Sequence, residues 1–246
     1  MSNLVNKTAL VTGGSRGIGA GIVRRLAADG ANVAFTYVNG KEQAEALVKE
    51  IEATGRKAVA IQADAANAEA VTAAVETTVA KLGTLDILVN NAGIGTFAPI
   101  DQATLEDFDK TFNVNVRAVF VAIKAAAKHM TSGGRIINIG SINATRVPFE
   151  GGSIYAASKA AIQGLTTALS RDFGPLGITV NNIQPGPVNT DLNPDNGPFA
   201  DFLRTQMAIG RYGTTDELAS FVSYLAGPEA GYITGASLNA DGGFKG

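Results

Sequence analysis

The sequence predicts an α/β fold in which a doubly wound, parallel sheet of seven strands carries helices on both faces. Short runs rich in β-branched residues alternate along the chain with longer segments of helical periodicity. The short runs are mostly apolar without strict alternation, as expected for strands buried on both faces of a parallel sheet. This alternation builds βαβ units with right-handed crossovers. A length of 246 residues without a linker or internal repeat favours a single domain over residues 1–246.

The expected strands cover residues 8–12, 32–37, 57–61, 85–89, 135–140, 179–183 and 237–239. Three helices are expected between the first four strands, because apolar residues recur there at spacings of three or four. These residues are Ile18, Ile22 and Leu26, then Ala44, Leu47, Val48 and Ile51, then Val71, Val75 and Val79. Two longer helical patterns follow at about 105–130 and 153–173.

The least regular stretch, residues 185–213, contains four prolines. Within it Phe199, Phe202, Leu203 and Met207 have the spacing of a short amphipathic helix. Ligands of open α/β sheets bind beyond the carboxyl ends of the strands. We therefore expect the part at about 190–213 to cover a substrate, the alternative being a surface excursion that shields the core.

Composition excludes several classes of protein. Twenty Lys and Arg against 22 Asp and Glu give a net charge of −2, so nucleic-acid binding has no support. The absence of Cys excludes disulfides and a thiolate nucleophile, and the single His, His129, leaves no metal site to expect. No signal peptide or membrane span is recognisable, which predicts a cytoplasmic protein without a membrane partner.

A glycine-rich turn follows the first expected strand and leads into the first helix. Its frame is Gly13-x3-Gly17-x-Gly19, which differs from the usual G-x-G-x-x-G fingerprint but offers the same exposed N–H groups to a pyrophosphate. The same residues also match the hydrolase elbow G-x-S-x-G, with Ser15, Asp86 and His129 as its triad. That alternative is disfavoured, because His129 lies near the end of a helical pattern rather than on a loop after a late strand.

Further motifs stand at the ends of the later strands. They are Asn90-Asn91-Ala92-Gly93, Asn113-Val114-Asn115, Ser141, Tyr155-Ala-Ala-Ser-Lys159, and Pro185-Gly186 with Thr190. Together with the glycine turn they resemble the short-chain dehydrogenase/reductase family over essentially the whole chain, in particular bacterial NADPH-dependent carbonyl and 3-oxoacyl reductases. The resemblance implies a Rossmann-type fold. The C-terminal half also resembles a bacterial subgroup that includes a cyclic di-GMP-binding protein of biofilm dispersal.

The candidate catalytic residues are Asn115, Ser141, Tyr155 and Lys159. Tyr155 and Lys159 are four residues apart and share one helix face. A nearby ammonium favours the phenolate, so we expect a lowered pKa and proton exchange with a carbonyl or alcohol oxygen near neutral pH. Ser141 can hydrogen-bond the same oxygen. The resemblance implies that Lys159 reaches the nicotinamide ribose and that Asn115 holds a water of a proton relay.

The resemblance also implies the residues that bind NADP(H). The turn around Ser15, Arg16 and Ile18 would face the pyrophosphate and the adenosine. Asp64 and Ala65 would face the adenine; the alternative role of Asp64 is that of a helix N-cap. Tyr37 occupies the position where NAD-selective folds place an acid, so no carboxylate repels a 2′-phosphate and Arg16, with Lys41 as a possible second cation, attracts one. The complete expected set is Gly13, Ser15, Arg16, Gly17, Ile18, Gly19, Tyr37, Asn39, Asp64, Ala65, Asn91, Ala92, Gly93, Tyr155, Lys159, Pro185, Gly186, Val188 and Thr190.

The expected substrate pocket is mostly apolar, which suits a bulky or moderately hydrophobic ketone. Its candidate walls are Ile94, Ile142, Asn143, Val147, Phe149, Ile154, Pro187, Leu192, Phe199 and Phe202. Arg146 either meets an anionic group or is an ordinary loop residue. Small residues along 153–173 would let this helix approach another helix closely. The resemblance implies that it pairs with its counterpart in a second copy of the chain and that the protein is a homotetramer. The alternative is that the small residues pack on the chain's own sheet. We therefore expect a carbonyl reductase, or alternatively a protein that binds or sequesters cyclic di-GMP.

Overall fold

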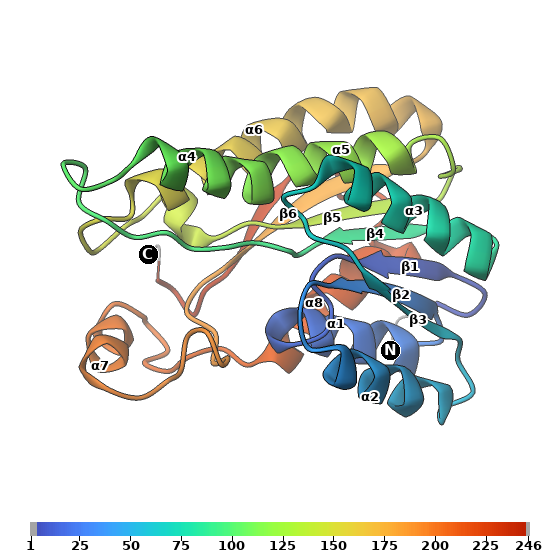
Figure 1. Ribbon diagram of the computed structural model, residues 1–246, viewed down its shortest axis with the longest axis horizontal. Helices are drawn as coiled ribbons and strands as arrows, with labels where there is room; N and C mark the ends of the chain where they lie inside the picture. Colours follow the sequence, from blue (N-terminus) through green and yellow to red (C-terminus); the bar gives the residue numbers. More distant parts are fainter. Residues whose placement is uncertain (1–3, 245–246) are drawn as a thin grey trace.

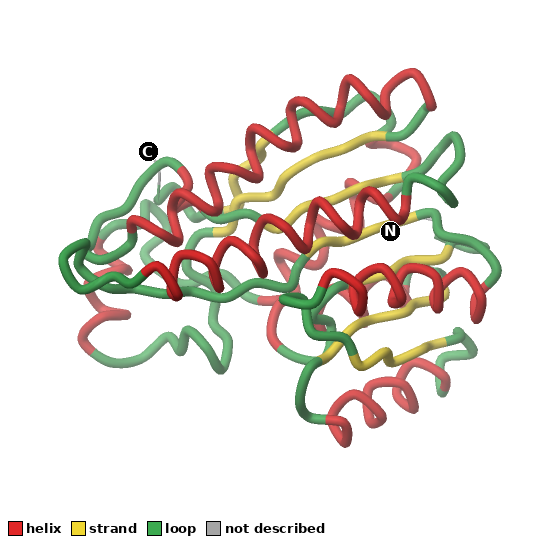
Figure 2. Tube along the Cα trace, turned by 45° about the horizontal axis from the view of Figure 1, so that its top comes forward, coloured by secondary structure: helices red, strands yellow, loops and turns green. Residues whose placement is uncertain are grey.

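A computed structural model describes residues 4–244 of the chain. Its centre is a seven-stranded sheet of order β3-β2-β1-β4-β5-β6-β7, in which every neighbouring pair is parallel (Figures 1 and 2). The strands are β1 (Thr8–Val11), β2 (Asn32–Tyr37), β3 (Ala58–Gln62), β4 (Ile87–Asn90), β5 (Arg135–Ile139), β6 (Thr179–Pro185) and β7 (Ser237–Ala240). The predicted doubly wound α/β fold is confirmed. The largest deviations are two residues, at the start of β4 and the end of β6.

The helices form one layer on each face of the sheet (Figure 1). On one face lie α1 (Gly17–Ala28), α2 (Lys41–Glu52) and α8 (Thr215–Ala226). On the other lie α3 (Ala68–Leu82), α4 (Leu105–Phe112), α5 (Ala118–Ala126) and α6 (Ser153–Phe173). Along β1, Ala9 and Val11 enter the first core and Leu10 enters the second. Because both faces are covered, strand residues of either orientation must be apolar, which explains the uninterrupted apolar runs.

Helix α8 has no counterpart among the expected elements, although its sequence carries the local signals of a helix. Thr214 and Glu217 form a reciprocal capping box at its start. Leu218 and Val222 recur at helical spacing and are buried in the core that α1 shares. A Cβ atom placed on Gly21 of α1 would lie 3.1 Å from Thr215 Cβ, so the two helices approach closely.

The long helix expected at 105–130 is interrupted and ends early. The segment Asn113–Arg117 between α4 and α5 is wound as a wider π-helical turn, and α5 ends at Ala126. Such turns within α-helices are frequent at functional sites. Here the turn contains Asn115, which is 1% exposed.

The carboxyl ends of the strands carry the irregular segments of the chain. The order of the sheet reverses between β1 and β4, which is the place where open α/β sheets bind ligands. After β6 the chain forms α7 (Pro198–Thr205), which stands beyond the sheet in Figure 1. A third apolar cluster joins α7 to Ile142 and Phe244. Short 3-10 turns lie at Ile142–Ala144, Gly174–Leu176 and Pro228–Ala230. No helix within residues 4–244 is long and apolar enough to cross a membrane.

Candidate active site

The glycine turn between β1 and α1 has a backbone conformation and close contacts that only glycine permits. Gly13 and Gly17 have φ angles of 63° and 53°, a left-handed conformation that side chains disfavour. A Cβ atom on Gly19 would lie 2.2 Å from the Gly13 carbonyl oxygen and 2.6 Å from Asn91 Nδ2. The turn therefore packs as tightly as its backbone allows, and its outer side carries no Cβ atoms at these glycines.

Two threonines that the sequence analysis did not single out fix this turn. Thr12 Oγ1 accepts hydrogen bonds from the backbone N–H groups of Asn91 and Ala92, both at 3.0 Å. In return, Asn91 Nδ2 donates to the carbonyl oxygens of Thr12 at 2.9 Å and Gly13 at 3.0 Å. Thr36 Oγ1 accepts from the Gly13 N–H at 2.9 Å. The signal that could have revealed Thr12 is a hydroxyl residue between the last strand residue and the first glycine.

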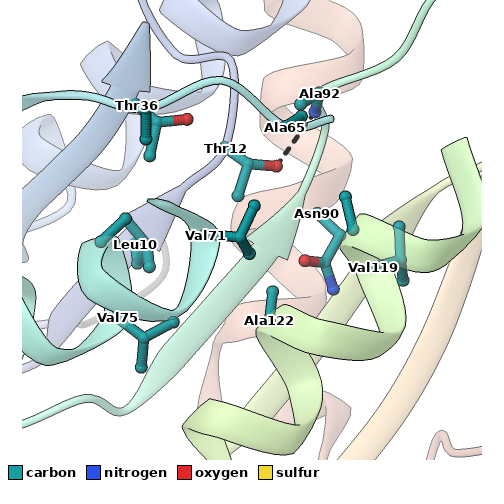
Figure 3. Close-up of a pocket in the computed structure, with 13 residues that line it drawn as sticks. Leu10, Thr12, Thr36, Ala65, Val71, Val75, Asn90, Ala92, Val119 and Ala122 are labelled. Atoms are coloured by element: carbon teal, nitrogen blue, oxygen red, sulfur yellow. Dashed lines mark hydrogen bonds between the residues drawn. The ribbon is translucent and has the colours of Figure 1, made fainter. Parts of the chain in front are cut away.

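Figure 3 shows the bond from Ala92 to Thr12 beside a small cavity beneath the turn. Ala65 and Ala92, both expected at the adenosine side, contribute to its wall with apolar residues from α3 and α5. Its volume of about 10 Å³ admits about one water molecule. A cavity of this size is too small for a cofactor, so Ala65 and Ala92 could contact one only on their sides that face away from it.

Arg16 is the N-cap residue of α1, and its exposed side chain makes no hydrogen bond or ion pair with the described residues. Tyr37 ends β2 and is 9% exposed, while Asn39 is exposed in the following turn. Lys41, the expected second cation, instead forms an ion pair with Glu45, with its Nζ 3.6 Å from Glu45 Oε1. Arg16 is thus a cation available to a ligand phosphate at this end of the sheet.

The alternative role of Asp64 as a helix cap is wrong. Asn67 caps α3, accepting from the backbone N–H groups of Glu69 and Ala70. Asp64 is exposed, and its Oδ1 accepts from the Ala66 N–H at 2.8 Å in the loop after β3. Its carboxylate therefore stays at the edge of the sheet where an adenine is expected.

Ser141, Tyr155 and Lys159 line one cavity of about 750 Å³ at the carboxyl ends of the strands. Ser141 follows β5, and Tyr155 and Lys159 project from the first turns of α6. Burial raises the pKa of the Tyr155 phenol, and a hydrogen bond with Ser141 counteracts part of that rise. The phenol is therefore neutral at pH 7, which is the state that donates a proton, whereas a lowered pKa was expected.

Lys159 Nζ is 5.7 Å from the centre of the Tyr155 ring and donates a hydrogen bond to the Ile139 carbonyl oxygen at 3.0 Å. Burial lowers the pKa of this ammonium group to about 8. The group that was expected to favour the phenolate thus begins to lose its own charge as the pH approaches 8.

Asn115 anchors the loop that follows β4. Its Oδ1 accepts from the Ile94 N–H at 2.9 Å, and its Nδ2 donates to the Ile94 carbonyl oxygen at 2.9 Å and to Ser158 Oγ at 3.0 Å. Gly93 lies just before this anchor, and a Cβ atom there would lie 3.4 Å from Lys159 Nζ. The side chain of Asn115 thus fixes the backbone beside Lys159, and its contact with a relay water stays a prediction.

The structure brings most of the expected residues to this cavity but leaves others away from it. From the cofactor set, its wall includes Ile18, Asn91, Gly93, Pro185, Gly186, Val188 and Thr190, and from the pocket set Ile94, Ile142, Asn143, Phe149, Pro187, Leu192 and Phe199. Val147, Ile154 and Phe202 do not line it. Val147 packs towards Gly152, Ile154 is buried at the start of α6, and Phe202 lies behind Phe199 on α7. Residues of the wall that sequence reasoning missed include Phe97, Glu150, Leu203 and Phe244.

Arg146 is not available to an anionic ligand. Its guanidinium donates to the carbonyl oxygen of Phe244 and to Gln206 Oε1 at 3.1 Å, and it lies 5.1 Å from the centre of the Phe244 ring. Of the two roles considered for Arg146, contact with an anionic group is not supported, because its contacts instead join the loop after β5 to Gln206 at the end of α7 and to Phe244.

The hydrolase alternative is wrong. Asp86 precedes β4 at the amino ends of the strands, where it pairs with Lys7 at 3.1 Å, whereas Ser15 lies at the carboxyl ends. His129 Nε2 lies 2.9 Å from Glu76 Oε2 of α3. Within residues 4–244 there is also no group of three His, Cys, Asp or Glu residues that could hold a metal ion.

Comparisons with known proteins agree with this arrangement. A family model described as enoyl-(acyl carrier protein) reductase matches residues 13–245. A short-chain dehydrogenase/reductase from Serratia marcescens BCRC 10948 is 57% identical, with a TM-score of 0.98 over 99% of this chain and 100% of that one. A short chain dehydrogenase from Burkholderia cenocepacia J2315, solved in complex with NADP, is 55% identical, with the same TM-score and coverage. The cyclic-di-GMP-binding biofilm dispersal mediator protein of Escherichia coli (strain K12) is 49% identical over 99% of each chain. This chain belongs to the short-chain dehydrogenase/reductase family.

Proposed function

We propose that the protein is an NADPH-dependent reductase that converts a ketone to an alcohol. The observation that carries the proposal is the common cavity of Ser141, Tyr155 and Lys159, which opens between the glycine turn and the segment after β6. The residues fit a dinucleotide: the glycine turn presents backbone without Cβ atoms, and Gly93 leaves room beside Lys159. NADP is bound by the Burkholderia relative, and the free Arg16 with Tyr37 at the acid position favours the phosphorylated cofactor.

When bound, NADPH would supply the hydride that the carbonyl carbon takes up, and it would be oxidised to NADP⁺. Tyr155 donates its phenolic proton to the carbonyl oxygen, so that the product is a neutral alcohol. Ser141 hydrogen-bonds the same oxygen and orients it. The ammonium group of Lys159 stabilises the phenolate left on Tyr155, which then regains a proton from solvent through the water expected at Asn115. The reverse reaction needs the phenolate and is favoured by higher pH.

We further propose that the segment at about 190–213 covers the substrate within a single domain. Helix α7 supplies Phe199, Ala200 and Leu203 to the cavity wall, while the preceding loop supplies Leu192. Leu192 and Phe199 are 75% and 54% exposed, so a ligand would bury surface that now faces water. The exposed side chains of this segment favour a cover, while the inner face of α7 packs on Ile142 and Phe244.

The proposed homotetramer has support from an apolar groove between α6 and the continuous stretch of α4, the π-helical turn and α5. The groove, of about 590 Å³, is lined by Phe112, Phe120, Ala161, Gly164, Leu165 and Ala168 with three neighbours. Phe120 is 50% exposed there, and the small residues of α6 permit a close approach of a second helix pair. We expect assembly in the cytoplasm, without a nucleic-acid or membrane partner.

The proposed activity is tested by NADPH oxidation with a panel of ketones and by the Tyr155→Phe variant. Because the variant keeps the ring but has no proton to transfer, kcat should fall by about 10²–10⁴-fold. NADPH affinity should stay within about threefold, since the phenyl ring remains. The matched control is Tyr224→Phe on the outer side of α8, which should leave kcat unchanged. Activity of Tyr155→Phe close to that of the unmodified protein would refute the assigned mechanism.

A second candidate function is the binding of cyclic di-GMP, which the 49% identical Escherichia coli protein suggests. The intact group of Ser141, Tyr155 and Lys159 argues against a protein that only sequesters a ligand. Titration with cyclic di-GMP, in parallel with the ketone panel, separates the two functions. Micromolar binding without turnover of any ketone would favour the second candidate.

A further inference from the structure

Aromatic rings from separate parts of the chain meet beside the catalytic tyrosine. The ring centre of Phe97, in the loop after β4, is 5.4 Å from that of Tyr155. Phe149, in the loop after β5, lies 5.7 Å from Phe97 and edge-on to it. Phe199 of α7 lies 5.6 Å from Phe149, again edge-on. Three segments that follow three different strands thus build one aromatic wall, defined here as Phe97, Phe149 and Phe199.

The aromatic wall belongs to the cavity and not to the core. All three rings line the same space as Ser141 and Tyr155. Phe97 and Phe199 are each 54% exposed, although they lie in a concave site. Aromatic surface exposed in a concave site marks a place where an apolar ligand gains by burial. Rings also attract one another through edge-to-face and offset contacts beyond the effect of burial.

Charges in the cavity disfavour an acidic substrate. The charged side chains among its lining residues are Lys159 and Glu150. Lys159 is committed to the Ile139 carbonyl and to Tyr155, and Arg146 is held by Gln206 and Phe244. Glu150 is exposed and makes no hydrogen bond or ion pair with the described residues. A carboxylate or phosphate near the aromatic wall would therefore meet an acid and find no free cation.

We propose that the substrate is an aryl ketone without an anionic group, whose ring packs against Phe97, Phe149 and Phe199. Its carbonyl oxygen then meets Ser141 and Tyr155, its carbon takes the hydride of NADPH, and the products are a secondary aryl alcohol and NADP⁺. The inference rests on the proposed reductase activity and adds the class of substrate. The cavity of about 750 Å³ lies within the size range of small-molecule sites.

The first test compares acetophenone with cyclohexyl methyl ketone, 4-acetylbenzoate and acetoacetyl-coenzyme A. The two methyl ketones have the same carbon skeleton, but the ring of acetophenone is planar, aromatic and conjugated with the carbonyl. We expect kcat/KM to be about three- to tenfold higher for acetophenone than for its cyclohexyl analogue, the range that aromatic contacts provide. The carboxylate of 4-acetylbenzoate should lower kcat/KM by tenfold or more. Equal values for the methyl ketones, or a preference for acetoacetyl-coenzyme A, would overturn the inference and leave the reductase activity intact.

A binding measurement separates recognition of the ring from the chemical step. Benzamide and cyclohexanecarboxamide are unreactive analogues of the two methyl ketones, and calorimetry gives their Kd values for the protein saturated with NADP⁺. We expect benzamide to bind about three- to tenfold more tightly. In Phe97→Leu and Phe199→Leu this ratio should fall towards one. The control is Phe108→Leu on α4, whose ring stacks on Phe112 outside the cavity. An unchanged ratio in both cavity variants contradicts the proposal, whereas absence of NADPH oxidation with every ketone refutes the proposed function instead.

Discussion

Replacing Lys159 by methionine should make the protein more stable at neutral pH while it abolishes turnover. Lys159 is 6% exposed, and burial lowers the pKa of its ammonium group from 10.5 to about 8. At about 1.36 kcal/mol per pKa unit, this shift corresponds to about 3 kcal/mol of destabilisation by the buried charge. Methionine has a similar length and no charge, but it loses the hydrogen bond to Ile139, worth about 1 kcal/mol. The net expectation at pH 7 is a gain of about 2 kcal/mol in the free energy of unfolding.

The difference in the free energy of unfolding between Lys159→Met and the unmodified protein should depend on pH. Below pH 8 the lysine is protonated in both the folded and the unfolded chain, so the folded state carries the full cost of the charge. Between pH 8 and 10.5 the folded state releases the proton first, and the unfolded state binds more protons. The stability of the unmodified protein therefore rises with pH in this window relative to Lys159→Met. The advantage of the variant should shrink to about zero by pH 10.

Urea unfolding at pH 7 and pH 10, at one protein concentration, measures the difference. The matched control is Lys128→Met, which removes an exposed charge and should change the free energy of unfolding by less than about 0.5 kcal/mol at both pH values. A Lys159→Met variant that is less stable than the unmodified protein at pH 7 would refute the reasoning. So would a stability difference that does not change between the two pH values.

Three further predictions concern the cofactor and the cover. The kcat/KM of the unmodified protein should be at least tenfold higher with NADPH than with NADH at fixed ionic strength. Either Arg16→Ala or Tyr37→Asp should lower this ratio. A preference of the unmodified protein for NADH would contradict the roles assigned to Arg16 and Tyr37. Hydrogen exchange in residues 192–207 should slow when NADPH and a ketone are added, and unchanged exchange there would make the segment a static surface. Gly19→Ala should weaken NADPH binding by tenfold or more, because its Cβ atom would displace the Gly13 carbonyl. The control is Gly174→Ala, whose Cβ atom would have no neighbour within 4 Å and should leave NADPH binding unchanged. Equal affinities of the two variants would exclude this explanation.

Sequence reasoning recovered the sheet because continuous apolar runs and their spacing are local properties. It did not recover the π-helical turn at Asn113–Arg117, since the residues around Asn115 have ordinary helical periodicity and the wider winding depends on tertiary contacts. The pKa of Tyr155 differed from expectation because spacing places Lys159 on the same helix face but does not reveal that Lys159 is buried and that Tyr155 is partly withdrawn from water.

The walls of the cavity were the hardest part to predict. Phe97 lies in a loop without periodicity, and its role depends on ring contacts with residues more than 50 positions away. Arg146 stands in a stretch with the composition of a surface loop, yet its hydrogen-bond partners Gln206 and Phe244 lie 60 and 98 positions further along the chain. Helix α8 is a different case, because the capping residues Thr214 and Glu217 were visible in the sequence and a search for such pairs would have found it.

The buried position of Phe244 bears on how the protein should be handled as a reagent. This residue is 1% exposed and forms part of the cavity wall, although it stands two residues from the final glycine. A protein shortened by the loss of Phe244 would lose part of the cavity wall together with the carbonyl oxygen that accepts a hydrogen bond from Arg146. Purification tags and immobilisation linkers are therefore better attached ahead of β1, whose start lies at the opposite ends of the strands from the cavity.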